Sequence, residues 1–108
     1  MILSTTPNVP GGRIVKSLGL VRGNTIRARN AGHDVLAAFR NLAGGEVREY
    51  TKMMAEAREQ AIDRMVEEAR TLGANGVVGV RFQTSMIMRG AAEMLCYGTA
   101  VVLERDDA

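Results

Sequence analysis

The sequence predicts one small α+β domain in which a long amphipathic helix lies along a β-hairpin. Three observations support this class. Apolar residues recur at three-and-four spacing over residues 46–72, apolar and polar residues alternate over residues 77–88 and again over 93–104, and a turn at residues 89–92 separates the two alternating stretches. The helix and each strand would both span roughly 40 Å, so the helix can lie along the hairpin.

The long helix is expected to run from Glu46 to about Leu72. Its apolar stripe consists of Val47, Tyr50, Met54, Ala57, Ala61, Met65, Ala69 and Leu72, and its charged side carries Glu49, Lys52, Glu56, Glu59, Asp63, Glu67 and Arg70. Gly73 and the turn at Asn75 and Gly76 end this helix. A shorter helix is expected after Asp34, which is a suitable N-cap, and Gly44 ends it.

A first strand is predicted over residues 13–22, after the loop signal at residues 10–12. Its apolar side chains fall on two faces, with Ile14, Leu18 and Leu20 on one and Val15 and Val21 on the other. Gly23 and Asn24 then interrupt the strand, and residues 25–29 form a short continuation.

The C-terminal hairpin carries apolar residues on both of its faces. One face holds Val78, Val80, Phe82, Met86 and Met88, with Met94, Cys96, Gly98, Ala100 and Val102 on the return strand. The other holds Val77, Gly79, Arg81, Gln83, Ser85 and Ile87, with Leu95, Tyr97, Thr99, Val101 and Leu103. Because one long and one short helix can cover a single face of a three-stranded sheet, we expect a second subunit to cover the other. The alternative is that the first strand and the N-terminal loop fold over it.

Composition excludes several classes of protein. An apolar fraction of 46% with 24% charged residues is typical of a globular domain and not of a disordered chain. A formal net charge of +2 is too small to indicate a nucleic-acid partner, and no apolar stretch approaches the roughly 20 residues that span a bilayer. With one cysteine and no secretory signal, we expect a reducing cytoplasm. A single domain (1–108) is predicted, with its core over 13–103 and a frayed tail at 104–108.

A family resemblance covers nearly the whole chain. It is carried by residues 40–46, Tyr50, residues 57–58, 64–65, 72–82 (Leu-Gly-Ala-Asn-Gly-Val-Val-Gly-Val-Arg-Phe) and 97–101 (Tyr-Gly-Thr-Ala-Val). In order and spacing these segments resemble the YbjQ-like family of bacterial and archaeal proteins, mostly uncharacterised and often labelled heavy-metal-binding. The resemblance implies a dodecin-like β-α-β-β subunit and a homopentameric ring. It brings no catalytic residues to transfer, and we predict none.

Four sulfur-bearing residues form the first candidate site. If the hairpin is centred near Ala91, Met86 faces Cys96 and Met88 faces Met94, which places three thioethers and one thiol on one face. Soft sulfur ligands select Cu(I) or a similar metal ion. The alternative is that these methionines and the cysteine fill the core under the helix. That interpretation is favoured, because no Cys-x-x-Cys or His-rich ligand set accompanies them.

A polar group on the second sheet face forms the other candidate site. Arg81, Gln83, Tyr97 and Thr99 share this face and could line a channel or a subunit seam, where arginines favour anions. The alternative is an intersubunit ion pair between Arg81 and Glu93 or Glu104. His33 is interpreted as a surface or capping residue, and Arg22, Arg27 and Arg29 as part of a solvated or ion-paired loop.

These observations leave three functional hypotheses. The first is a non-enzymatic oligomeric ring that binds a small ligand or a metal ion at subunit seams or on its axis. The second is an interaction platform for a protein partner. The third is an enzyme with a composite site between subunits, and no motif in the sequence supports it directly.

Overall fold

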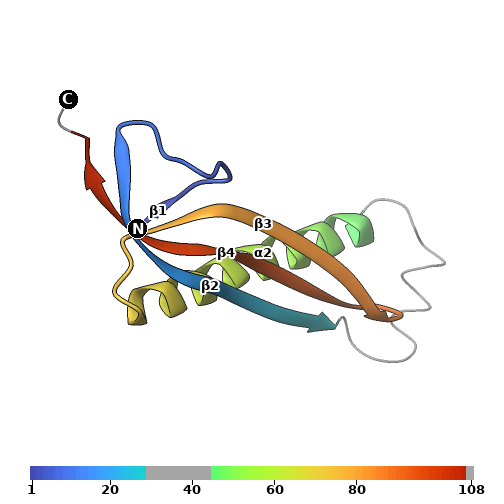
Figure 1. Cartoon of the computed structure of the whole chain (residues 1–108). Coiled ribbons are helices and arrows are strands. Elements are labelled where there is room, and N and C mark those ends of the chain that lie inside the picture. The colour runs from blue at the N-terminus through green and yellow to red at the C-terminus, as the bar shows by residue number, and fades with distance from the viewer. Residues whose placement is uncertain (29–44, 107–108) are drawn as a thin grey trace.

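The α+β class is confirmed by the computed structural model, which describes residues 1–28 and 45–106, with side chains from residue 51 in the second segment. Its elements are β1 (Ile2–Leu3), β2 (Gly12–Ala28), α2 (Gly45–Thr71), β3 (Gly76–Met88) and β4 (Ala91–Arg105). The strands form one mixed sheet in the order β1-β3-β4-β2, in which only the β1–β3 pair is parallel. Helix α2 lies along one face of this sheet (Figure 1). The predicted short helix and His33 lie outside the described residues.

Strand β2 is longer than the sequence predicted. Gly23 and Asn24 do not interrupt it, and it pairs with β4 along its whole length. Gly23 is needed for a different reason, because its Cα faces the helix. A Cβ there would lie 2.8 Å from Arg64 Cβ and nearer still to the carbonyl oxygen of Ala61 and the amide nitrogen of Met65. The glycine therefore lets β2 and α2 approach closely.

Irregularities in β2 overturn the predicted faces of that strand. The register with β4 shifts between Ile14 and Lys16 and again between Ser17 and Gly19, where Gly19 has a φ of 98°. Each extra residue moves the following side chains to the opposite face. As a result Ile14 and Leu18 pack in different clusters, and Leu20 is 66% exposed.

A bulge in β3 has the same effect. Its register with β4 shifts between Val78 and Arg81, around Gly79, whose φ is 63°. Val77 and Val80 therefore face the helix, while Val78 faces away and packs with Val101 and Leu103. The sequence prediction, which put Val78 with Val80 and put Val77 on the other face, was wrong because it assumed unbroken alternation.

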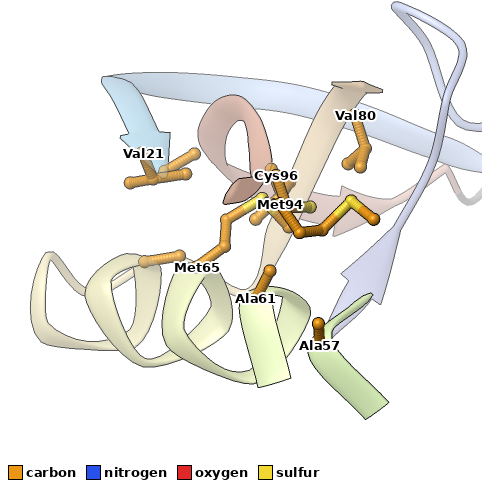
Figure 2. Close-up of a cluster of buried hydrophobic side chains, with 10 residues drawn as sticks. Val21, Ala57, Ala61, Met65, Val80, Met94 and Cys96 are labelled. Carbon is orange, nitrogen blue, oxygen red and sulfur yellow. Dashed lines mark hydrogen bonds between the residues drawn. The ribbon is translucent and has the colours of Figure 1, made fainter. Parts of the chain in front are cut away.

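The main core lies between α2 and the inner face of the sheet (Figure 2). Its buried residues are Val21, Ala57, Ala61, Met65, Ala69, Val77, Val80, Met94, Cys96 and Ala100. The helix packs mainly on β2 and β4 and barely touches β3. It therefore covers β4 of the predicted hairpin but little of β3, and the inner-face side chains near the tip of β3 are exposed.

A second, smaller cluster lies on the outer face, away from the helix. Val78, Val101 and Leu103 are buried there, with Val9 and Ile14 packed against them. The N-terminal loop thus covers the base of the outer face, as the alternative interpretation proposed. The expectation that a second subunit covers Val101 and Leu103 was therefore wrong, because residues of the same chain bury them.

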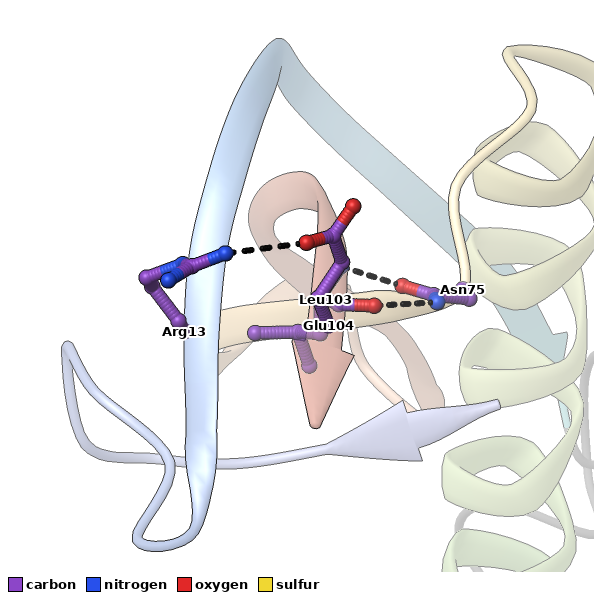
Figure 3. A network of polar contacts seen from close by, with 4 residues as sticks. All are labelled: Arg13, Asn75, Leu103 and Glu104. Atoms are coloured by element: carbon purple, nitrogen blue, oxygen red, sulfur yellow. Dashed lines mark hydrogen bonds and ion pairs between the residues drawn. The ribbon is translucent and has the colours of Figure 1, made fainter. Parts of the chain in front are cut away.

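Local polar contacts fix the end of the helix. The amide of Ala74 bonds to the carbonyl of Ala69 and that of Gly73 to Arg70, a Schellman arrangement in which Gly73 has a φ of 88°. Asn75 then binds β4 through both ends of its side chain (Figure 3): Nδ2 donates to the Leu103 carbonyl at 2.8 Å, and Oδ1 accepts from the Leu103 amide at 2.7 Å.

The C-terminal strand also extends farther than expected. Glu104 and Arg105 are the last residues of β4. The carboxylate of Glu104 forms an ion pair with the guanidinium of Arg13, with 3.0 Å between Oε2 and Nη2. Glu104 and Arg105 therefore belong to the sheet and not to a frayed tail. No helix in the described parts of the chain is long and apolar enough to cross a membrane.

Candidate functional site on the outer sheet face

The four predicted sulfur ligands are not brought together. Met86 pairs with Ala92 and Met88 with Ala91, so the hairpin is centred at residues 89–90 and not near Ala91. Met86 and Met88 are 69% and 64% exposed, while Met94 and Cys96 are buried beneath the helix. The predicted pairing was wrong because the turn is two residues long, with Gly90 at a φ of 79°.

Cys96 instead contacts a methionine from the helix. Its thiol donates to Met65 Sδ at 3.5 Å, and both side chains are fully buried. Desolvation by burial raises the pKa of the Cys96 thiol, which disfavours the thiolate that metal binding requires. Over residues 1–28 and 45–106, no group of three or more His, Cys, Asp or Glu side chains could hold a metal ion. Met94 and Cys96 therefore fit the packed core that the sequence favoured, whereas that interpretation was wrong for Met86 and Met88, which are exposed.

The four polar candidates do share one face of the sheet. Arg81 pairs directly with Tyr97, Val78 with Thr99 and Gln83 with Leu95. All of these lie on the side opposite the helix, because their chain neighbours Val80, Cys96 and Ala100 are in the main core. The arrangement places Arg81 and Tyr97 in contact range, with Gln83 and Thr99 in the adjoining rows.

Strand β2 extends these rows with residues that the sequence analysis did not place there. Arg22 pairs with Tyr97, Asn24 with Leu95 and Leu20 with Thr99. Arg22 faces outward because Val21 and Gly23 face the helix. Tyr97 is therefore flanked by one arginine on each side, in a row that we call the Arg–Tyr–Arg row (Arg22, Tyr97 and Arg81). The sequence analysis did not place Arg22 beside Tyr97, because it ended the strand at residue 22 and did not predict that β2 pairs with β4 there.

Arg81 also holds the N-terminal loop. Its Nη1 donates to the carbonyl of Thr5 at 2.7 Å and to that of Val80 at 2.9 Å. A guanidinium has five N–H donors, so these two bonds use only part of its capacity. The acidic residues predicted as its partners have contacts elsewhere within this chain, since Glu104 pairs with Arg13 and Glu93 accepts from Asn24 at 3.2 Å.

The charged side of the helix forms an open surface groove. It is lined by Arg27, Ala55, Glu56, Glu59, Gln60 and Asp63. Arg27 crosses from β2 to donate to Gln60 Oε1 at 2.9 Å, so this cation is bonded to an amide of the helix. The groove is a solvated helix face, in agreement with the amphipathic pattern of the sequence.

A four-stranded mixed sheet with one long helix on its inner face defines a small α+β domain with an open, arginine-bearing outer face. Residues 1–104 match the family model YbjQ_1, described as "Putative heavy-metal-binding". The chain therefore belongs to this family.

Its relatives come from both bacteria and archaea and carry the name UPF0145 protein. The chain is 58% identical over 103 residues to a protein of Halorubrum lacusprofundi (95% of this chain, 99% of the relative). It is 52% identical over 107 residues to one of Thermosipho africanus (99% of each). The fold is similar to a crystal structure from Pediococcus pentosaceus, a DUF74-family protein of unknown function, with a TM-score of 0.62 at 15% identity, covering 96% of this chain and 98% of that one.

Proposed function

We propose that this chain assembles into a homo-oligomeric, non-enzymatic ring that binds a small ligand on the outer face of its sheet. The observation that carries the proposal is an incomplete sheet: among the described residues, nothing pairs with the outer edge of β2, and β1 pairs with only the first part of the β3 edge. The family resemblance suggests five subunits. A reducing cytoplasm is the compartment that we propose, because Cys96 is free and buried.

The open edge of β3 is the first support. The N-terminal segment pairs with the start of this strand only, through Ser4 N to Val77 O (2.9 Å) and Gly79 N to Thr6 O (3.0 Å). Among the described residues, no strand pairs with this edge from Phe82 onward or with the outer edge of β2. Unpaired strand edges of this length recruit another strand.

Exposed apolar side chains lie beside these edges. On β3, Phe82, Met86, Ile87 and Met88 are 43–69% exposed, and on β2, Leu20 and Ile26 are 66% and 61% exposed. Burying each such side chain fully would contribute about 1.5–3 kcal/mol. The helix cannot cover the β3 residues, since it packs over β2 and β4.

Edge-to-edge pairing between copies satisfies both features. The β3 edge of one copy and the β2 edge of the next are different surfaces, so the contact is heterologous and closes as a ring when the rotation permits. Strands β2 and β3 run in the same direction, because both are antiparallel to β4. In a ring whose axis follows the strands, the new pair would be parallel.

Native mass spectrometry tests this assembly. We expect the wild type as a closed multiple of its 11.7 kDa subunit. Met86→Asp places a charge on the uncovered β3 tip, where the side chain is 69% exposed, and should yield monomers. Leu72→Asp is the matched control, since it makes the same change at a 47% exposed position at the end of the helix and should leave the ring intact.

A wild type that stays monomeric at micromolar concentration would refute the ring. A ring that carries no small molecule but retains a protein partner would favour the alternative function, an interaction platform. An enzyme with a site between subunits has no support from the described side chains beyond the open outer face itself.

A further inference from the structure

We propose that the N-terminal segment (residues 1–6) is a stop that confines a neighbouring copy to the part of the β3 edge from Phe82 onward. The segment would thereby fix the register in which β2 of that copy pairs with β3. This inference rests on the edge-to-edge ring proposed above and deepens it, because it names the device that selects one closed assembly.

The backbone bonds of the segment are the first argument. Four bonds of 2.9–3.0 Å join it to β3 and the residue before it: Ile2 N to Asn75 O, Ser4 N to Val77 O, Gly79 N to Thr6 O and Val80 N to Ser4 O. They use the outward-facing backbone groups of this edge as far as Val80. A second strand therefore cannot pair with the same part of β3.

Arg81 adds a side-chain contact at the end of the covered part. Its Nη1 donates to the carbonyl of Thr5 at 2.7 Å and to that of Val80 at 2.9 Å. The guanidinium thus lies between the segment and β3 and ties the two together. The covered part of the edge ends at this residue.

The rest of the edge is open. Val80 directs its amide to this edge, and backbone groups point the same way at every second residue of a strand. Phe82, Thr84 and Met86 therefore direct their amides and carbonyls to the same edge, since the register with β4 is regular over residues 81–86. Among the described residues, none pairs with these groups. The open edge begins directly after Arg81.

The orientation of β1 is the second argument. It lies parallel to β3, as β2 of a neighbouring copy would in the proposed ring. Both register shifts in β2 end at Gly19, so only residues 20–28 can form a continuous ladder with the open edge. Sliding this ladder by one residue would exchange the two faces of a strand, and a larger slide would change the stagger on which closure depends. A fixed limit on β3 prevents both.

Native mass spectrometry of full-length proline variants tests the stop. Ser4→Pro removes the amide that bonds to Val77 and puts the proline ring against β3, so it should release the segment. Thr5→Pro is the matched control, because among the described residues the amide of Thr5 has no hydrogen-bond partner. We expect one closed mass for the wild type and the control, and a mixture of masses for Ser4→Pro. Amide exchange at Gly79 and Val80 should accelerate by about tenfold or more in Ser4→Pro only.

A second pair of variants tests the open edge without touching the segment. Thr84→Pro removes an amide that faces this edge, where a single subunit tolerates proline, and should yield monomers. Thr84→Val loses the hydroxyl that donates to Met94 Sδ at 3.3 Å but keeps the amide, so it should stay assembled. A ring that persists in Thr84→Pro would put the contact elsewhere and would overturn the inference.

Three results from the first pair would also overturn it. One is a Ser4→Pro protein with the single mass of the wild type. Another is a mixture of masses in both variants, which would mean that the bonds to β3 do not set the register. The third is a Ser4→Pro protein that is monomeric only, which would make the segment part of the contact and not its limit. All three leave the ring in place, whereas a monomeric wild type refutes the ring and the stop together.

Discussion

Replacing Gly23 with alanine tests how closely β2 and α2 approach each other. The new Cβ would lie 2.8 Å from Arg64 Cβ, whereas two carbon atoms pack favourably at roughly 3.5–4.0 Å. The helix would have to rise by close to 1 Å, because the other near atoms are backbone atoms of Ala61 and Met65 that cannot rotate away. That displacement would loosen the whole main core. Overpacking costs about 1–3 kcal/mol in most cores, and we expect about 3 kcal/mol here.

Urea denaturation at one fixed protein concentration measures this cost, since the proposed assembly would make the stability depend on concentration. Gly12→Ala is the matched control on the same strand. Its Cβ would meet nothing closer than 3.5 Å, so the free energy of unfolding should change by less than about 0.5 kcal/mol. If the two variants unfold at the same urea concentration, the close approach at Gly23 does not limit the packing.

Three further predictions concern stability. Asn75→Ala removes both bonds to the main chain of Leu103 and should lower the free energy of unfolding by about 2–3 kcal/mol in urea titrations, whereas a loss below about 0.5 kcal/mol would mean that water replaces the side chain. Gly73→Ala places a side chain at a φ of 88° and should cost about 1 kcal/mol by thermal unfolding, and an unchanged melting temperature would contradict the Schellman cap. Cys96 gives a pH dependence: burial raises its pKa above the ordinary value of 9.0, so its contribution is complete below that value and is lost as the pH rises through the folded-state pKa. The stability difference between the wild type and Cys96→Ala should therefore shrink above about pH 9, and a difference that stays constant to alkaline pH would show that the thiol ionises as easily in the fold as in the unfolded chain.

The elements with strong periodicity were predictable from the sequence. The helix was expected over residues 46–72 and is observed at Gly45–Thr71, and β3 was expected over residues 77–88 and is observed at Gly76–Met88. In both segments apolar residues recur at one spacing over many positions, and this spacing alone identifies the type of element. The short strand β1 was not predictable, because two residues have no period and their pairing depends on a partner more than 70 positions away.

The candidate site was predictable only in part. Arg81 and Tyr97 were expected to share a face, and they do. The alternation of residues on each strand determines which face each side chain occupies. The sulfur set failed because the misplaced hairpin centre moves the partner of Met88 by three residues, and the register shift between Met86 and Met88 moves the partner of Met86 by one more. Met86 therefore meets Ala92 and not Cys96. The place of Arg22 in the row was missed because Gly23 was interpreted as the end of the strand. Only the structure shows that this glycine is required by the close approach of the helix.

The bulges explain why the outer face has two chemically different parts. Around Gly79 the register shift brings Val78 to the outer side, where it joins Val101 and Leu103 under the N-terminal loop. Without that shift Val78 and Arg81, three residues apart on one strand, could not both face outward. The apolar base is therefore covered within the chain. The Arg–Tyr–Arg row next to it is not covered by this cluster, so the exposed apolar side chains that would drive the proposed assembly lie at the β3 and β2 edges and not at the centre of the sheet.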